Sequence, residues 1–443
     1  MIRASTRLIR LAALWAITAL LPVIARQLDS ELASMALALW AAAGVLLLVV
    51  LLLDIVLAWK RPIPNAERRL PAALSLQQLH PVKITLSSAE LPREFEVADQ
   101  HPNDDFDTGL PKVIHKSELP VTEFTYHYRP SQRGKAIFSN ILLWLPSPLG
   151  LISKKYEISA TRTVPVYPDF SVLQRDALHA HQDSRLDPGS RRQPRRGEGF
   201  EFNQLREYNN GDSLRQIDWK ASARRRKLIS REYQEEQNQQ LIVLLDGGER
   251  LAMAVNGLTG FDHALNATLL LAWSALKQQD KPGVMLFSSD TPCWVPPVRG
   301  PAGANTILNS LYAMQPGSGA SDYSKAAEQL LRRWKKHSLV VMITRLQPDD
   351  EPEILAAIKL LAKRHLLLIA DIQLPEQLAL QHREINDTDD ALLVAGDAAY
   401  QESRRALYSR LRHAGALVTD AAPEQLPARL NQMYLSLKRS GRI

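Results

Sequence analysis

The chain has 443 residues and a formal net charge of +7, with 54 Lys and Arg against 47 Asp and Glu. That length leaves room for two or three domains, and the modest positive excess suits an anionic membrane surface or nucleic acid. The single cysteine, Cys293, excludes an internal disulfide and is consistent with a reducing compartment.

Two long apolar runs stand near the amino terminus, at residues 8–25 and 32–58. Each is long enough to cross a bilayer as a helix, and the short polar segment between them predicts a transmembrane helical hairpin within residues 1–61. A cleaved signal peptide is the alternative for the first run, but no small-residue cleavage site is clear before the second.

Basic residues flank this hairpin on its outer sides, whereas the connecting segment holds one Arg and two acids. The flanking residues are Arg3, Arg7, Arg10, Lys60, Arg61, Arg68 and Arg69. Because positive charge stays on the cytoplasmic side, the pattern predicts a two-pass membrane protein. Both ends of the hairpin, and the soluble part, would then face the cytoplasm.

Residues 70–169 change to short segments of alternating apolar and polar residues, separated by Pro, Gly, Asp and Asn. This alternation predicts an antiparallel β-sandwich, because every second side chain faces the core. The expected strands are 82–86, 94–97, 122–128, 136–145, 156–161 and 164–167. Turns are expected at 129–134 and 146–151.

Residues 170–240 form the next segment, which begins with an expected short helix at 170–181. A basic stretch containing Pro and Gly follows at 184–196. It could bind phosphates or acidic partners, but a solvated linker beside the membrane explains it as well.

The stretch from Gly199 to Asp246 is the most densely patterned part of the chain. Its residues at fixed spacing are Gly199, Phe202, Leu205, Arg206, Tyr208, Gly211, Asp212, Arg215, Ile217, Asp218, Trp219, Ser222, Ala223 and Arg224. This pattern resembles the signature of domain-of-unknown-function family 58 (DUF58). In that family Gly-x-x-Phe-x-x-Leu-Arg-x-Tyr precedes Gly-Asp, Arg-x-Ile-Asp-Trp and Ser-Ala-Arg.

The resemblance covers nearly the whole chain and implies an architecture more than a reaction. Family members usually carry two membrane helices, a β-rich segment and a carboxyl-terminal domain like the von Willebrand factor type A domain. No enzymatic activity is firmly attached to the family. Its members often occur beside MoxR-type AAA+ ATPases, so the resemblance implies a partnership of that kind.

Charged residues of opposite sign alternate along the signature: Arg206, Asp212, Arg215, Asp218 and Arg224. They could form a partly buried ion network that ties the sandwich to the carboxyl-terminal domain, with Trp219 packed beneath, because buried charges need partners. The alternative is a partner-docking face that also includes Tyr208, Gly211 and Ser222.

Residues 241–443 alternate between helix and strand, which predicts a doubly wound parallel sheet with helices on both faces. The expected strands are 241–245, 283–288, 338–344, 366–372 and 416–419. The expected helices are 262–279, 302–314, 323–336, 352–364, 398–414 and 427–438. This α/β pattern agrees with the type A-like domain that the resemblance implies.

Ligands of such sheets bind at the carboxyl ends of the strands, where a type A metal site would have Asp-x-Ser-x-Ser. Here Asp246 is kept, but Gly248 and Arg250 replace the two serines. The remaining positions are Ser321 and Asp322 in a later loop and Arg345 after the fourth strand. We therefore expect no metal. Asp246 should instead accept hydrogen bonds from an Arg, whose guanidinium could occupy the place of the ion, or from backbone N–H groups of the following turn.

Other candidate chemistry is sparse. Cys293 lacks a base that the sequence can pair with it, and His179 and His181 lack a third metal ligand. No phosphate-binding Gly-x-x-x-x-Gly-Lys-Ser/Thr run and no Gly-x-Ser-x-Gly turn is present. We expect no catalytic residue and no cofactor.

The leading hypothesis is a non-enzymatic scaffold in the inner membrane that presents its type A-like domain to a MoxR-type AAA+ ATPase or its client during assembly of an envelope complex. Membrane lipid is the other expected partner, nucleic acid is not expected, and the oligomeric state is open. One alternative is a cytoplasm-facing hydrolase using Cys293 or a residual metal. A second alternative is a nucleic-acid binder using residues 191–196 and 224–227, with Trp219 as its one interleaved aromatic.

Overall fold

The computed structural model describes residues 2–443 except 29, 88–90, 103–107, 116–120, 169–200, 210–216, 235–237, 256, 289–291, 374–376, 378–379 and 381–384. The chain forms two compact units, Met1–Val166 and Tyr167–Ile443. The expected helix at 170–181, the basic stretch at 184–196 and His179 and His181 lie outside the described residues.

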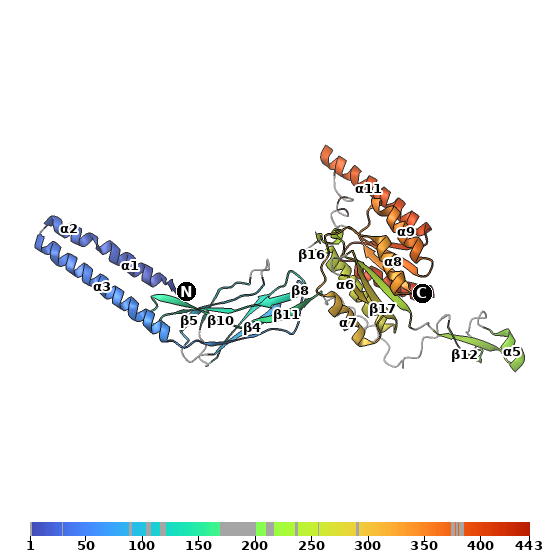
Figure 1. The fold of residues 1–443 in the computed structure, drawn as a ribbon, viewed down its shortest axis with the longest axis horizontal. Coiled ribbons are helices and arrows are strands. Elements are labelled where there is room, and N and C mark those ends of the chain that lie inside the picture. Colours follow the sequence, from blue (N-terminus) through green and yellow to red (C-terminus); the bar gives the residue numbers. More distant parts are fainter. Residues whose placement is uncertain are drawn as a thin grey trace. The chain divides into compact units, whose positions relative to one another are not determined.

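The first unit begins with a helical hairpin, drawn in blue in Figure 1. Its arms are α1 (Thr6–Thr18) with α2 (Leu20–Leu28), and α3 (Ser30–Lys60). Two segments, Thr6–Ile24 and Ala33–Lys60, are long and apolar enough to cross a membrane. The expected pair of apolar helices is thus confirmed, and the helices extend farther into the connecting segment than the sequence indicates.

Two tryptophans join the arms of this hairpin. The rings of Trp15 and Trp40 stack with their centroids 4.4 Å apart. Each indole N–H donates to the backbone carbonyl of the other residue, Trp15 to Trp40 at 3.1 Å and Trp40 to Trp15 at 3.0 Å. This reciprocal pairing satisfies two indole donors within the hairpin.

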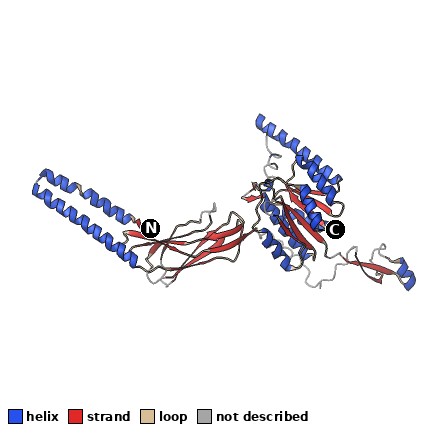
Figure 2. Cartoon of the chain, in the orientation of Figure 1, coloured by secondary structure: helices blue, strands red, loops and turns tan. Residues whose placement is uncertain are grey.

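The rest of the first unit consists of antiparallel sheets, as the alternation predicted (Figure 2). One sheet has the order β1-β10-β9-β5-β6, from Ile2–Ala4, Ile152–Ile158, Ile141–Pro146, Glu94–Asp99 and Lys112–His115. A second pairs β2 (Asn65–Arg69), β4 (His80–Ser87) and β7 (Val121–Tyr128), and a third pairs β3 (Leu74–Ser75), β11 (Arg162–Tyr167) and β8 (Gly134–Phe138). The strand expected at 136–145 is two strands, β8 and β9, which lie in different sheets.

The turn at Ser147–Leu151 fastens these sheets to the hairpin. Asp54 of α3 is fully buried, and its carboxylate accepts the Ser147 hydroxyl together with the backbone N–H groups of Leu149, at 3.0 Å, and Leu151, at 3.2 Å. The Ser5 hydroxyl, at the N-cap of α1, donates to the carbonyl of Gly150 at 2.6 Å. The one acid in the second apolar run is therefore satisfied by the turn between β9 and β10, as a buried charge requires.

The second unit begins with the signature segment. Strands β12 (Glu201–Glu207) and β13 (Ile229–Gln234) pair antiparallel, and α5 (Trp219–Arg225) lies in the connection between them. The turn residues 210–216 are outside the described part of the chain.

The large sheet of the second unit has the order β18-β17-β14-β19-β20-β21. The strands are Cys293–Val295, Lys281–Phe287, Gln240–Asp246, Leu339–Thr344, Leu366–Ile372 and Leu417–Ala421. All pairs are parallel except the edge pair of β17 and β18. The smaller β15 (Ala254–Val255) and β16 (Leu258–Thr259) form a separate two-stranded ribbon.

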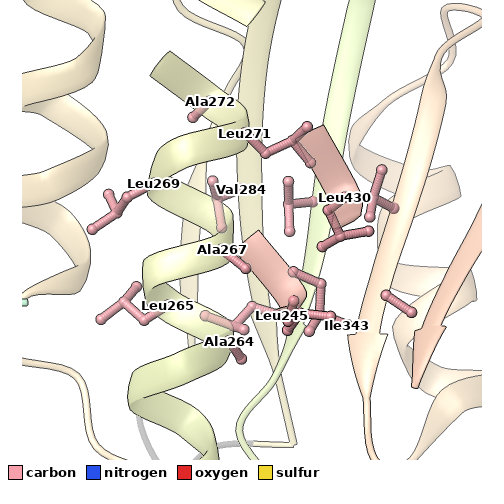
Figure 3. Packing of buried hydrophobic residues seen from close by; sticks show 14 of the residues in the cluster. Leu245, Ala264, Leu265, Ala267, Leu269, Leu271, Ala272, Val284, Ile343 and Leu430 are labelled. Atoms are coloured by element: carbon pink, nitrogen blue, oxygen red, sulfur yellow. The ribbon is translucent and has the colours of Figure 1, made fainter. Parts of the chain in front are cut away.

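Helices cover both faces of this sheet. On one face α6 (Gly260–Lys277), α7 (Pro301–Leu311) and α12 (Leu426–Arg439) pack on Val243 and Leu245. On the other, α8 (Tyr323–Arg333), α9 (Glu351–Leu361) and α11 (Thr388–His413) pack on Ile242 and Leu244. Figure 3 shows part of the first core, which includes Ala264 and Ala267 of α6, Leu245 and Ile343 of the sheet and Leu430 of α12. Alternate side chains of β14 thus pack into two hydrophobic cores, one on each face of the sheet. This confirms the doubly wound, type A-like fold.

Candidate functional site

The candidate site lies at the carboxyl ends of two neighbouring strands of the large sheet. Asp246 ends β14, and Thr344 ends the adjacent parallel strand β19. Ser321 lies in the loop that leads into α8. All three are buried, and Asp246 is fully so. The sheet topology therefore brings one carboxylate and two hydroxyls together at the edge where ligands of such sheets bind.

The Asp246 carboxylate accepts hydrogen bonds on both oxygens. The backbone N–H of Gly248 donates to Oδ1 at 2.9 Å. The hydroxyls of Ser321 and Thr344 donate to Oδ2 at 2.6 Å and 2.5 Å. Beyond them, Tyr323 shares a 3.1 Å hydrogen bond with the Thr344 hydroxyl. We call these residues, Asp246, Gly248, Ser321, Tyr323 and Thr344, the Asp246 network.

Burial raises the pKa of Asp246 above its ordinary value, and the hydrogen bonds from Ser321, Thr344 and Gly248 oppose that rise. Burial disfavours the ionised carboxylate, whereas each donor favours it. The three donors are therefore what makes a charge tolerable at a site that water does not reach.

Of the two donors expected for Asp246, an Arg or a backbone N–H of the following turn, the structure shows the N–H of Gly248, and no guanidinium of the described residues donates to the carboxylate. Arg250 instead forms a salt bridge with Asp350, and the Arg345 guanidinium contacts the sulfur of Met253. Arg250 acts on Asp246 only through its positive charge, which lowers the carboxyl pKa. Hydroxyls and a backbone amide, rather than arginine, satisfy the carboxylate.

Gly248 stands where a type A metal motif has its first serine, and a side chain has no room there. A Cβ at this position would lie 2.7 Å from Ser321 Oγ and 3.1 Å from Asp246 Oδ1. The space is already used by the Ser321 hydroxyl that serves Asp246. Sequence and packing thus agree on a glycine at this position.

A hard divalent cation needs about six oxygen ligands, which these residues do not supply as arranged. Both hydroxyls donate to Asp246 Oδ2, and Oδ1 accepts the backbone N–H of Gly248. Asp322 turns away and caps α8 by accepting from the N–H of Lys325 at 2.8 Å. Within the described part of the chain, no group of three His, Cys, Asp or Glu could hold a metal ion.

A second buried network lies one strand farther along and has no counterpart in our expectations. Asp371 on β20 is opposite Thr344 in register, and its carboxylate accepts from Arg404 at 2.5 Å and from Tyr408. Its other oxygen accepts the N–H of Leu346 at 2.8 Å. The only sequence signal for this network was an acid, Asp371, near the end of a predicted strand. Its partners on α11 lie more than 30 residues farther along the chain.

Within the signature, Asp218 and Ser222 are structural. Asp218 caps α5 by accepting from the N–H of Ala221 at 2.9 Å. The Ser222 hydroxyl donates to the Asp218 carbonyl at 2.7 Å and accepts from the N–H of Ile229 at 2.9 Å. Ser222 therefore links α5 to β13. Together, Asp218 and Ser222 hold the conformation in which the other residues of α5 are displayed.

Trp219 does not pack beneath a buried network, and that expectation is wrong. Its side chain is 68% exposed at the first residue of α5. Arg224 is exposed as well, whereas Arg206 is half-buried and donates to the carbonyl of Glu207 at 3.1 Å. Tyr208 is half-buried, and Gly211, Asp212 and Arg215 lie outside the described residues. The buried apolar residues on either side of α5 in the sequence are Ile217 and Ile229 instead.

The burial and hydrogen bonds of these residues distinguish the signature residues that stabilise the fold from those whose side chains are exposed. We expect Asp218→Ala to lower the stability of the second unit by about 1 kcal/mol, because it removes a helix cap. Trp219→Ala should leave the melting temperature unchanged, since the side chain is exposed. Thermal melts of Tyr167–Ile443 measure both, and a large loss in Trp219→Ala would return this residue to a packing role.

Cys293 begins the edge strand β18 and is half-buried. Burial raises the pKa of its thiol, so the reactive thiolate is disfavoured. The thiol faces the carbonyl of Ser310 at 3.8 Å rather than a base. This environment is that of a packed thiol.

Comparison with known proteins places this domain in a family. Residues 204–415 match the model of a family described as "Protein of unknown function DUF58". The chain is also similar to a Bacillus subtilis (strain 168) protein, "Uncharacterized protein YeaD", with 26% identity over 122 residues. That alignment spans 28% of this chain and 30% of the relative's length.

Among solved structures, the SpRpn10 VWA domain matches 44% of this chain and 95% of its own, with 13% identity and a TM-score of 0.28. The conserved hypothetical protein BatB from Bacteroides thetaiotaomicron matches 46% of this chain and all of its own, with 13% identity and a TM-score of 0.29. The fold assignment itself rests on the strand order and the two helical layers described above.

Proposed function

We propose, from the premise that this chain carries a DUF58 family domain, that it is a non-enzymatic adaptor anchored in the bacterial inner membrane. Its type A-like domain would bind a protein partner on the cytoplasmic side. The partner that the family resemblance suggests is a MoxR-type AAA+ ATPase or its client, during assembly of an envelope complex.

The observation that carries this proposal is the closed Asp246 network. Catalysis at the strand-end edge would need a nucleophile, base or ion able to meet a substrate. Here the carboxylate and both hydroxyls are buried and hydrogen-bonded to one another. The network holds β14, β19 and the α8 loop in fixed positions, which suits a binding edge.

The anchor is supported by the two apolar helices and by the contacts of Asp54 with the Ser147–Leu151 turn. The basic flanks of the hairpin support a cytoplasmic carboxyl terminus. A reporter that is active only outside the cytoplasm, fused after Ile443, should therefore be silent in membranes that contain the protein. Activity of that reporter would reverse the proposed topology.

Affinity purification of the full chain from solubilised membranes tests the partnership. We expect an AAA+ ATPase of the MoxR type to co-purify, in an amount that changes between ATP and ADP because such ATPases change conformation with nucleotide. The matched control is a tagged Met1–Val166, which keeps the membrane hairpin and the antiparallel sheets but lacks the DUF58 domain. Equal recovery with that control, or no ATPase with the full chain, would contradict the proposal.

Of the two alternatives, the hydrolase is opposed by the raised pKa of Cys293 and by the closed carboxylate site. Nucleic-acid binding has one observation in its favour, because Trp219 is exposed beside basic residues of α5. A labelled single-stranded oligonucleotide titrated at several salt concentrations distinguishes it. A salt-dependent affinity that Trp219→Ala removes would favour this alternative over the adaptor.

A further inference from the structure

The segment Ile217–Ile229, which contains α5, presents an exposed aromatic within a dense cluster of positive charge. It holds five basic residues against one acid, for a net charge of +4. The basic residues are Lys220, Arg224, Arg225, Arg226 and Lys227, all exposed. Lys227 pairs with Glu207 at 2.9 Å. We call this segment the α5 head.

Hydrogen bonds and the backbone conformation at its ends fix the structure of the α5 head. Asp218 caps the helix, Ser222 links it to Ile229, and Arg226 closes it in the left-handed conformation with φ 52°. Trp219 is therefore displayed by a fixed scaffold. Tryptophan and arginine are the residues that most often dominate the energy of a protein interface.

The amino-terminal half of α11 presents the complementary chemistry. Residues 388–402 contain four acids and no Lys, Arg or His, for a net charge of −4. Leu392 and Leu393 on this half are 68% and 50% exposed, which is unusual for adjacent leucines on a helix of a soluble domain.

These leucines line a groove of about 650 Å³. Gly396 and Tyr400 contribute to its wall, and Asp389 and Asp397 place carboxylates on its lining. The two leucines offer an apolar surface for an indole, and the two carboxylates are opposite in charge to the basic residues around Trp219. We call this surface the α11 groove.

We propose that the α5 head of one chain docks in the α11 groove of a second copy, so that the protein self-associates through its DUF58 domain. Trp219 would enter between Leu392 and Leu393, and Arg224 and Arg225 would approach Asp389 and Asp397. Because head and groove are different surfaces, the contact is head-to-tail and builds a ring or a chain rather than a symmetric pair. This inference is independent of the ATPase partner proposed above.

The proposal is tested on the full chain in a neutral detergent, by sedimentation velocity over a series of protein concentrations. We expect the mass to rise with concentration from one copy, 49.6 kDa of protein, to multiples of it. Higher salt should weaken the association, since exposed charges are screened. A protein that stays a single copy at every concentration would overturn the proposal. It would do so even if the α5 head then bound its own chain, a lipid surface or another protein.

Charge reversal identifies the two surfaces. Arg224→Asp with Arg225→Asp in the head, and Asp389→Lys with Asp397→Lys in the groove, should each weaken association at least tenfold. Association should return when the two charge-reversed proteins are mixed, or when both reversals are made in one chain. In both cases the head and the groove again carry opposite charges. The matched control for the head is Lys363→Asp with Arg364→Asp, which makes the same change in net charge as the reversed head at exposed positions after α9.

Two further variants keep the test independent of charge and of folding. Trp219→Ala and Leu392→Gln should each weaken association at least tenfold while melting like the wild type, since both side chains are exposed. Association that survives both variants, or charge-reversed pairs that fail to restore it although each variant melts normally, would overturn the assignment of these surfaces.

Discussion

Replacing Arg404 with alanine should lower the unfolding free energy of the second unit by about 3–5 kcal/mol, the cost of removing one partner from a buried ion pair. Arg404 is 3% exposed, and its guanidinium donates to the fully buried Asp371 and to Tyr408. Without it, the Asp371 carboxylate keeps the N–H of Leu346 and the Tyr408 hydroxyl but loses its countercharge.

Urea unfolding of Tyr167–Ile443, which contains both cores of the α/β domain, measures this loss. The neighbouring Arg405 is exposed and provides the matched control, because Arg405→Ala removes the same side chain from the surface of the same helix. We expect the control to unfold like the wild type. Equal midpoints for the two variants would show that the buried pair does not stabilise the domain.

Asp246→Ala should lower the unfolding free energy by about 2–4 kcal/mol, because it leaves several buried donors without their acceptor. Those donors are the hydroxyls of Ser321 and Thr344 and the N–H of Gly248. Asp349→Ala, at an exposed acid, is the control and should change stability little. A loss no larger than that of the control would mean that the network is dispensable.

The pH dependence of this site has a definite sign. The pKa of Asp246 is raised by burial above its ordinary value of 3.8, so the folded state holds the proton more tightly than the unfolded state. The resulting stabilisation is complete below 3.8 and is lost as pH rises through the folded pKa. Compared with Asp246→Asn, which does not titrate here, the wild type should gain stability as pH falls toward 3.8. A relative loss over that interval would mean that the donors, and not burial, dominate the pKa.

Much of the α/β domain follows from local sequence, because a buried parallel strand is a short apolar run. The strand expected at 366–372 has those limits in the structure, and 338–344 differs by one residue. Helix α11 begins at Thr388, ten residues before the expected start. The capping residue Asp387 and the acids Asp389 and Asp390 marked that start, but the exposed Leu392 and Leu393 obscured the one-sided pattern of a packed helix.

Only part of the candidate site could be predicted from the sequence, because the hydrogen-bond partners of Asp246 depend on strand register. Asp246 and Ser321 were expected near one another, but Thr344 becomes a partner only once β19 lies beside β14 in parallel. Sequence reasoning placed Arg345 there instead, one residue farther along. Likewise, Trp219 was expected to be buried because it is large and apolar, whereas burial depends on what the fold places over it.

The central claim is that the strand-end edge is a closed hydrogen-bonded network rather than a metal centre. A cation that bound the native state would stabilise it by mass action. Thermal melting of Tyr167–Ile443 in millimolar Mg²⁺ or Mn²⁺, against EDTA, therefore tests the claim most directly. We predict the same melting temperature in all three conditions, because Ser321, Thr344 and Gly248 already occupy both Asp246 oxygens. A cation-dependent rise that disappears in Asp246→Ala would contradict it.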